Sequence, residues 1–220
     1  MKIKLFVISI ILVLIFLQFR VINQVNNKFE ILQAENPNKD QFEKIVGNAY
    51  PAIFTNVSEN FFDLQKYSLD SINKIETESR ANLNTNLKTH FDYYAVPMKA
   101  KSEMAINLEG AGTTDYIMKQ SNYRLLICQL KGVKKLILFT PNQGKYLYLD
   151  KTGCKSQISF WTDDLLQYPK LEKTQYVEVV LYPGQMIYIP YQWYWASLND
   201  EDSFTVYHKS ESFFSRFICS

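Results

Sequence analysis

From Tyr123 onward, the chain alternates short apolar segments with turn residues. The segments are RLLICQL, KKLILFT, KYLYL, YVEVVLY, QMIYIP and SFTVYH. Each is rich in β-branched or aromatic residues and is bounded by Gly, Pro, Asn or Asp, which is the pattern of a strand between turns. The pair Pro183-Gly184 suits the centre of a type II turn, because glycine takes the positive φ that this turn requires. Many short strands at this spacing predict a mainly β fold, either a sandwich or a jelly-roll barrel.

The front of the chain has a mixed pattern. PAIFTNV indicates a short strand, FFDLQKYSLDSINKI indicates a helix, and THFDYYAV alternates like a further strand. Residues 23–41 are predicted to be a helical stalk or linker. Apolar residues recur there at three- and four-residue spacing until ENPNKD breaks the pattern: Ile22, Val25, Phe29 and Leu32. A stalk that leaves a membrane and a helix that packs on the folded domain both fit this spacing.

An apolar run near the amino terminus, Leu5 to Leu17, is preceded by Lys2 and Lys4 and followed by Arg20. Extended to Ile22, it passes the length of about 17 residues that a membrane-spanning helix needs. A cleavable signal peptide fits the strict run equally well, but LQFRVINQV offers no small-x-small cleavage site. We therefore interpret residues 1–22 as a transmembrane signal-anchor. Its flanking charges place the N-terminus in the cytoplasm and the C-terminal domain on the lumenal or extracytoplasmic side.

Composition limits the partners and the chemistry. The 220 residues suit one domain, and a hydrophobic share of 47% supports a sizeable core. A formal charge of +2 with dispersed basic residues indicates no nucleic-acid partner. The three cysteines have no metal-type spacing, and their odd number argues against a disulfide scaffold, although one bridge stays open. With only His90 and His208, few histidine-based mechanisms are available.

Three stretches carry a resemblance. They are EGAGTTDYIMKQSNYRLLICQLKGVKKLILFTP (109–141), SQISF followed by YPKL (156–171), and VEVVLYPGQMIYIPYQWYW (177–195). In this order and spacing they resemble the JmjC-type cupin family, in its cupin-8 or asparaginyl-hydroxylase-like branch. The resemblance implies a double-stranded β-helix with flanking helices over residues 42–220. It also implies the chemistry of oxygenases that use Fe(II) and 2-oxoglutarate.

The family's iron ligands are an H-x-D/E pair and a distal histidine, which together leave positions open for 2-oxoglutarate and O₂. When Gln129 is aligned with the family's glutamine, these ligand positions fall on Lys119, Ser121 and Trp195. An ammonium group has no lone pair, a serine hydroxyl is a weak ligand, and indole offers only an N–H donor. We therefore expect no catalytic residue and no metal site.

A metal site in another register is a further hypothesis. It would combine His90 and His208 with an acid such as Asp115 or Glu103. A lone histidine is more often a hydrogen-bonded structural residue than a ligand, and this favours the metal-free interpretation.

Other positions are candidates for ligand contacts. Lys134 matches the lysine that pairs with the far carboxylate of 2-oxoglutarate in this branch, but a solvent-facing strand residue has the same pattern. Tyr207 and Gln129 match positions near the cosubstrate. Tyr191 and Trp193 fit a binding surface at the barrel mouth, whereas Trp195 is expected to fill the vacated cavity.

These patterns favour a membrane-anchored pseudoenzyme without a cofactor, which acts as a protein-binding or scaffold module. The alternative is a divergent protein hydroxylase with Fe(II) and 2-oxoglutarate. A second alternative is a metal-free cupin that binds a small molecule such as a sugar or a dicarboxylate, with Lys134 as counter-ion. The apolar tail fits either a homodimer contact, as the resemblance implies, or a helix on its own barrel: Phe213, Phe214, Phe217 and Ile218.

Overall fold

The structure is a computed structural model that describes residues 25–57, 91–96 and 99–212, together with residues 9–10, 12–13, 16 and 87–88. Most of the predicted signal-anchor, the predicted helix over 61–75 and the apolar tail lie outside the described residues. Within the described part, no helix combines the length and the apolarity that a membrane span requires. The division of the chain at residues 22 and 41 stays a prediction.

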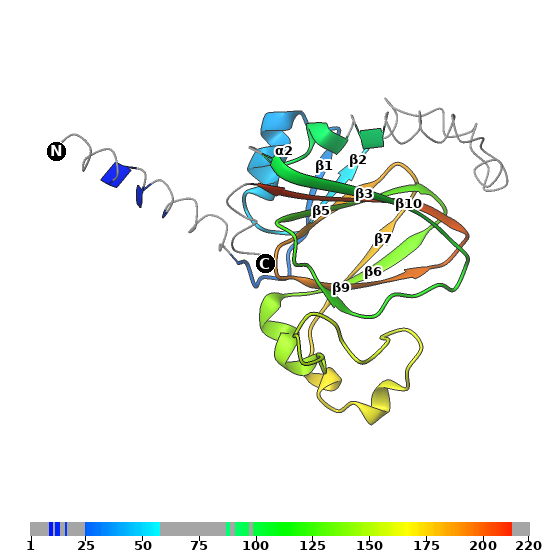
Figure 1. Cartoon of the computed structure of the whole chain (residues 1–220). Helices are drawn as coiled ribbons and strands as arrows, with labels where there is room; N and C mark the ends of the chain where they lie inside the picture. The colour runs from blue at the N-terminus through cyan, green and yellow to red at the C-terminus, as the bar shows by residue number, and fades with distance from the viewer. Residues whose placement is uncertain are drawn as a thin grey trace.

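Two β-sheets form the body of the protein (Figure 1). The larger sheet has the strand order β1-β2-β8-β5-β10-β3, and the smaller has the order β4-β9-β6-β7. The strands are β1 (Leu32–Glu35), β2 (Ala52–Thr55), β3 (Lys99–Glu109), β4 (Met118–Lys119), β5 (Arg124–Lys131), β6 (Lys134–Phe139), β7 (Val177–Leu181), β8 (Met186–Pro190), β9 (Tyr194–Asn199) and β10 (Ser203–Ser212). The pairing of β1 with β2 is parallel, and the other pairings between these strands are antiparallel. The predicted mainly β fold is confirmed.

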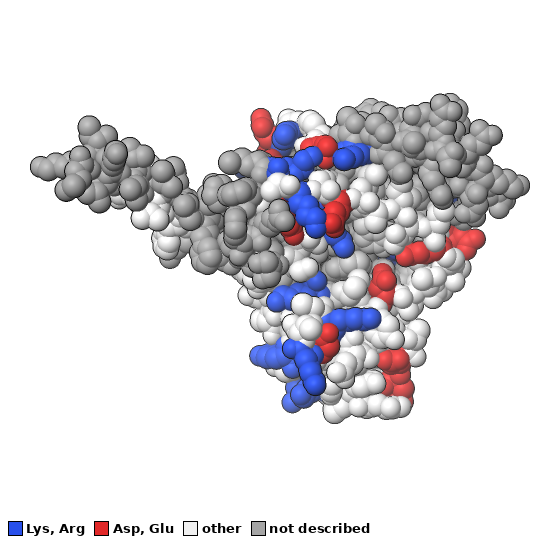
Figure 2. Space-filling view, in the orientation of Figure 1, with Lys and Arg blue, Asp and Glu red and all other residues white. Residues whose placement is uncertain are grey.

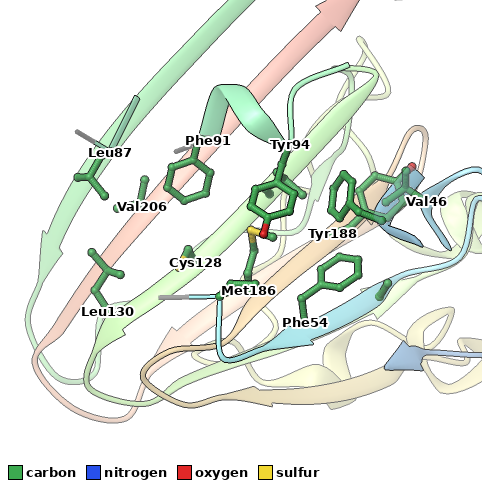
Figure 3. Packing of buried hydrophobic residues seen from close by; sticks show 14 of the residues in the cluster. Val46, Phe54, Leu87, Phe91, Tyr94, Cys128, Leu130, Met186, Tyr188 and Val206 are labelled. Carbon is green, nitrogen blue, oxygen red and sulfur yellow. The ribbon is translucent and has the colours of Figure 1, made fainter. Parts of the chain in front are cut away.

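Three apolar clusters hold these layers together. One lies between the sheets and joins side chains such as Leu125, Ile127 and Leu136. A second covers the outer face of the larger sheet, where Phe42 of helix α2 (Lys39–Val46) packs with strand residues. Figure 3 shows other members of this cluster, among them Phe91 and Tyr94. The third covers the smaller sheet beneath the segment between β6 and β7, which contains the 3₁₀ helices η2 (Pro141–Tyr146), η3 (Leu165–Gln167) and η4 (Leu171–Lys173).

Helix α2 is fixed at its start and on its buried side. Asn38 caps it, accepting a hydrogen bond from the Gln41 backbone, while the Gln41 side chain accepts one from the Asn38 backbone. The buried Arg124 guanidinium donates to both carboxylate oxygens of Glu43, at 3.0 and 2.8 Å. This two-bond pairing ties the helix to strand β5, and such paired hydrogen bonds are among the stronger polar contacts in proteins.

Six of the predicted strands are present in the structure. RLLICQL corresponds to β5, which sends Leu126 and Cys128 to the outer cluster and Leu125 and Ile127 to the cluster between the sheets. KKLILFT, YVEVVLY, QMIYIP and SFTVYH correspond to β6, β7, β8 and β10, and PAIFTNV to β2. Gly184 has a φ of 86°, as the type II turn requires.

Three predicted elements are wrong. The described residues 25–38 contain no helix, and 32–35 form strand β1, whose Leu32 and Ala34 pack on the outer cluster. Residues 91–93 are helical rather than extended, which buries Phe91 and Tyr94 on one side. KYLYL begins within η2 and forms no strand. In short segments, packing against the sheets outweighs local periodicity.

Strand β3 is an element that the sequence pattern does not predict. Met104, Ile106 and Leu108 pack against the outer cluster, while the alternate side chains include the polar Asn107 and Glu109. The strand therefore has one apolar and one polar face without an apolar run, and this weakens its signal.

Charged side chains of both signs are scattered over the face shown in Figure 2. Lysine and arginine side chains mix with acidic ones in its upper part and gather at the lower left, over the segment between β6 and β7 (Figure 2). That segment also carries Asp150, Asp163, Asp164 and Glu172. The absence of a nucleic-acid partner stays a prediction.

The turn after β5 provides a test of this packing. Gly132 has a φ of 75°, and a Cβ there would lie 2.4 Å from the Asp202 backbone oxygen. Gly153 has a similar φ of 71° but open space around it. We expect Gly132→Ala to lower the free energy of unfolding by about 3 kcal/mol and Gly153→Ala by about 1 kcal/mol. Urea unfolding measures both losses, and equal losses would contradict the described turn.

Candidate functional site

A cavity of about 440 Å³ lies where each sheet ends in an edge strand. Strands β3 and β4 are these edges, and the lining includes Glu103, Ala105, Asn107, Met118, Trp195 and Tyr207. This volume falls within the range of about 300–1,000 Å³ that is typical of small-molecule sites. The cavity is therefore the candidate functional site of the described residues.

The pairing of β4 with β9 decides which side chains face the cavity. Met118 lies opposite Trp195, and Lys119 lies opposite Tyr194. Residues opposite each other in a sheet share a face, and neighbours along a strand face opposite ways. Because Tyr194 packs in the cluster on the outer face of the smaller sheet, Lys119 also belongs to that face. Met118, and not Lys119, shares the cavity face with Trp195.

The predicted ligand positions therefore do not meet at one point. Ser121 is exposed and follows β4. Of the three predicted positions Lys119, Ser121 and Trp195, Trp195 is the one that lines the cavity. The Trp195 side chain is almost completely buried, but it only narrows the cavity, because about 440 Å³ remains beside it. The expectation that Trp195 fills this space is wrong.

The donors at the inward positions do not fit the iron site of the resemblance. A thioether is a soft, weak ligand, and indole has no lone pair to offer, whereas the oxygenase-type Fe(II) site uses two imidazoles and a carboxylate. Among the described residues, no group of three His, Cys, Asp or Glu side chains could hold a metal ion. Met118 and Trp195 thus occupy the cavity wall without supplying a ligand set for iron.

The structure also contradicts the hypothetical metal site that combines His208 with Asp115 or Glu103. The His208 Nε2 lies 2.8 Å from the Ser102 Oγ, and its ring stacks on Phe91 in the outer layer. Both acids line the cavity on the opposite side of the larger sheet. His90 lies outside the described residues.

Lys134 is buried between the sheets, so its interpretation as a solvent-facing residue is wrong. Its side chain is 0% exposed, and its Nζ donates to the Glu109 Oε2 at 2.9 Å. The same Nζ donates to the Tyr207 hydroxyl at 3.2 Å and lies 5.7 Å from that ring's centroid. The lysine assigned to a cosubstrate by the resemblance is thus paired with a carboxylate of its own chain.

Glu109 is held by further donors. Asn199 donates to its Oε2 at 2.9 Å, and Asn107 donates to its Oε1 at 3.2 Å. Burial raises the pKa of Glu109, but the hydrogen bonds from Asn199 and Lys134 outweigh it and bring the pKa below the ordinary 4.5. Because the folded pKa is depressed, the pairing stabilises the fold above about pH 4.5, and this contribution is lost as the pH falls through the folded value.

Tyr207 joins this polar group to the cavity. Its side chain lines the cavity and contacts Lys134, and its ring centroid lies 6.1 Å from that of Trp195. Burial, followed by the nearby charges of Glu109 and Asp115, raises the pKa of its hydroxyl. The hydroxyl therefore stays neutral at ordinary pH.

The other predicted contacts lie away from the cavity. Gln129 is fully buried, and its side chain hydrogen-bonds the backbone of Lys131 and Gly132 together with Ser203 and Thr205. It fastens the β5–β6 turn to β10. Trp193 is 1% exposed within the cluster between the sheets, so its assignment to a binding surface is wrong.

Tyr191 is half-buried, and its part in a binding surface stays a prediction. Met118, Glu109, Asn107 and Asn199 are site residues that the sequence did not reveal. The period-2 alternation of polar residues on β3 is the signal that could have indicated Asn107 and Glu109.

Residues 101–208 match the family described as cupin-like domain, cupin-8. The chain therefore carries a cupin-like domain over these residues. The stretch runs from β3 to β10 and so includes the cavity and the Lys134–Glu109 pair. The predicted resemblance and a mainly β, cupin-like fold are confirmed.

Several curated proteins are similar to this cupin-like domain. The tRNA wybutosine-synthesizing protein 5 of Danio rerio is 25% identical over 164 residues, covering 72% of this chain and 48% of that protein. Lysine-specific demethylase 8 of Danio rerio is 29% identical over 119 residues, covering 52% and 29%. Human HSPB1-associated protein 1 is 31% identical over 86 residues, covering 37% and 17%. The chain spans less than half the length of these relatives.

Neighbouring lysines on β6 test the importance of the buried pair. Lys134→Met leaves the Glu109 carboxylate without its cation, and we expect a loss of about 3 kcal/mol in the free energy of unfolding. Lys135→Met removes a contact to Asp200 in which both side chains are about one-third exposed, so we expect a much smaller loss. Chemical denaturation followed by circular dichroism gives both values. A Lys134 variant as stable as the Lys135 variant would contradict the described pairing.

Proposed function

We propose that the chain is a cupin-like domain that does not perform iron-dependent oxygenation and acts as a protein-binding module. The observation that carries the proposal is the pair at the cavity wall, where Met118 and Trp195 stand opposite each other and supply no imidazole or carboxylate. The buried Lys134 supports the same conclusion, because its charge is already matched by Glu109. Among the described residues, the cavity wall thus offers no ligand set for Fe(II), and the lysine that the resemblance assigns to the cosubstrate is already paired.

The edge of the smaller sheet supports a role in protein binding. Strand β7 ends that sheet, and it is flanked by Tyr176 and Tyr182, which are 46% and 54% exposed. Edge strands accept an added strand from a partner, and exposed tyrosines often anchor protein interfaces. The name of the relative HSPB1-associated protein 1 also describes an association with a protein. We propose that β7 and these two tyrosines form the partner surface.

Membrane anchoring belongs to the proposal. The apolar run over residues 5–17 would hold the chain in a bilayer, with the N-terminus cytoplasmic and the C-terminal domain lumenal or extracytoplasmic. A homodimer through the apolar tail is a further part. Alkaline extraction of membranes with protease protection checks the anchoring, and sedimentation velocity of the full chain checks the dimer. Release of the chain by alkali would exclude membrane anchoring, and a monomer at micromolar concentration would exclude the homodimer.

The cavity favours a second candidate function, which is small-molecule binding without metal. Its volume suits a ligand, and Trp195 and Tyr207 give it an aromatic wall. A dicarboxylate held by Lys134 is a weaker candidate than a neutral ligand, because Glu109 already neutralises that lysine. If a dicarboxylate stabilises the wild-type chain at lower concentrations than neutral ligands do, the dicarboxylate becomes the stronger candidate.

Anaerobic titration of the full chain with Fe(II) tests the loss of the iron site. We expect no stoichiometric binding, and no succinate from 2-oxoglutarate after O₂ is admitted, because the inward side chains offer no suitable donors. The control is the double variant Met118→His with Trp195→His, in which two opposed imidazoles should confer an affinity for divalent metal. One iron per wild-type chain together with succinate formation would establish the hydroxylase alternative instead.

The partner surface has its own test with a matched control. Chemical cross-linking in the native membrane identifies the partners, and each purified partner is then bound to the full chain in a reconstituted system. The double variant Tyr176→Ser with Tyr182→Ser should bind the partner at least tenfold more weakly than wild type. Tyr116→Ser removes another exposed tyrosine, which contacts Lys155, and should leave the affinity unchanged. An equal loss in both variants, or no loss in the first, would exclude this surface.

A further inference from the structure

We propose that Lys134, Asn199 and Asn107 form a carboxylate-binding site in which the Glu109 side chain is a built-in ligand. The site takes a free short-chain carboxylate when the Glu109 side chain is removed. This inference concerns the donors around one anion, and it stands whether or not the chain binds iron or a protein partner.

The donors converge from three strands on one carboxylate. Lys134 on β6 and Asn199 on β9 both donate to the Glu109 Oε2, each at 2.9 Å, while Asn107 on β3 donates to the Oε1. One charged donor and two amide donors thus point at the two oxygens of a single carboxylate, and charge-assisted hydrogen bonds of this kind bind carboxylates strongly. Such a set recognises the anion and not the chain that carries it.

The protein gives Lys134 no other anion among the described residues. Its other contact there is the neutral hydroxyl of Tyr207, and the nearby Asp115 accepts a hydrogen bond from Ser197 instead. A buried ammonium without a counter-ion is costly, because it has lost its water. Removing the Glu109 carboxylate therefore leaves a strong demand for another anion at the same place.

The cavity provides a route to this place. Asn107 and Tyr207 line it, and each also contacts a member of the Lys134–Glu109 pair. Truncating Glu109 to alanine opens space beside the Lys134 ammonium, next to these two lining residues. The lining beyond is partly apolar, with Ala105, Met118 and Trp195. This suits a carboxylate with a short aliphatic tail, such as acetate or propionate.

In the wild-type chain, the attached carboxylate prevents this binding. A tethered group acts at a high effective concentration, which is millimolar or more for a short connection, and a buried side chain that is already in position competes better still. Free acetate at moderate concentration should therefore not displace Glu109. The site is expected to respond only in chains that lack this side chain.

The experiment compares thermal unfolding of the full chain, in a non-ionic detergent at pH 7, in sodium acetate and in sodium chloride of equal concentration. Glu109→Ala should unfold at a lower temperature than wild type in chloride. Acetate should then raise its midpoint, by about 4 °C at ten times the dissociation constant and further with the logarithm of its concentration. Propionate should act at lower concentrations than acetate.

Two matched variants make the result specific. Glu109→Gln keeps the volume of the side chain, so the place stays filled and acetate should act no more than chloride. Glu109→Ala combined with Lys134→Met removes the buried charge, so the demand for an anion disappears and acetate should again act no more than chloride. Wild type should behave in the same way as these two variants.

The inference is overturned if acetate stabilises Glu109→Ala no more than chloride does. It is equally overturned if the double variant responds as strongly as the single one, because the effect would then be a general salt effect. Should Glu109→Ala fail to fold in chloride, the yield of folded protein after refolding in acetate becomes the measurement. Recovery in acetate alone supports the site, and failure in both salts overturns it.

Discussion

A lysine ammonium buried between two β-sheets is stable only when an anion and further hydrogen-bond partners lie beside it. Lys134 meets this condition through Glu109, at 2.9 Å, with Tyr207 as a second partner. Asn107 and Asn199 complete the arrangement by donating to the same carboxylate. Strands β3, β6, β9 and β10 supply these side chains, so both sheets take part. The positive charge of Lys134 is thereby neutralised within the fold.

Strand register decides the chemistry of the cavity in the same way. A shift of one residue moves a side chain to the opposite face of a sheet. Because Met118 pairs with Trp195, the inward positions carry a thioether and an indole, while Lys119 turns to the outer layer with Tyr194. Neither inward group suits Fe(II) of the oxygenase type. The charge pairing and the register therefore both support the proposal that this cupin-like domain acts in recognition and not in oxygenation.

The parts that could be predicted from the sequence are those where one local signal dominates. Strands β5, β6 and β8 are apolar on both faces, so their segments are recognisable without tertiary context. Strands β1 and β3 and the helical residues 91–93 depend on packing against the outer cluster, and short segments of this kind carry no decisive periodicity. The position of Trp195 on the cavity was inferred from the resemblance, but the pairing of Lys134 with Glu109 joins residues 25 apart in the chain. Such a contact follows from the three-dimensional arrangement and has no signature in local spacing.

The titration of the Glu109 carboxyl measures the central claim most directly. Carbon-13 NMR of the full chain, labelled at glutamate side-chain carboxyls and assigned with Glu109→Gln, follows this one group as the pH is lowered. If Lys134, Asn199 and Asn107 hold the carboxylate as described, its pKa lies below the ordinary 4.5. A pKa at or above 4.5 would mean that burial outweighs these donors, and that Glu109 is not the partner of the buried lysine.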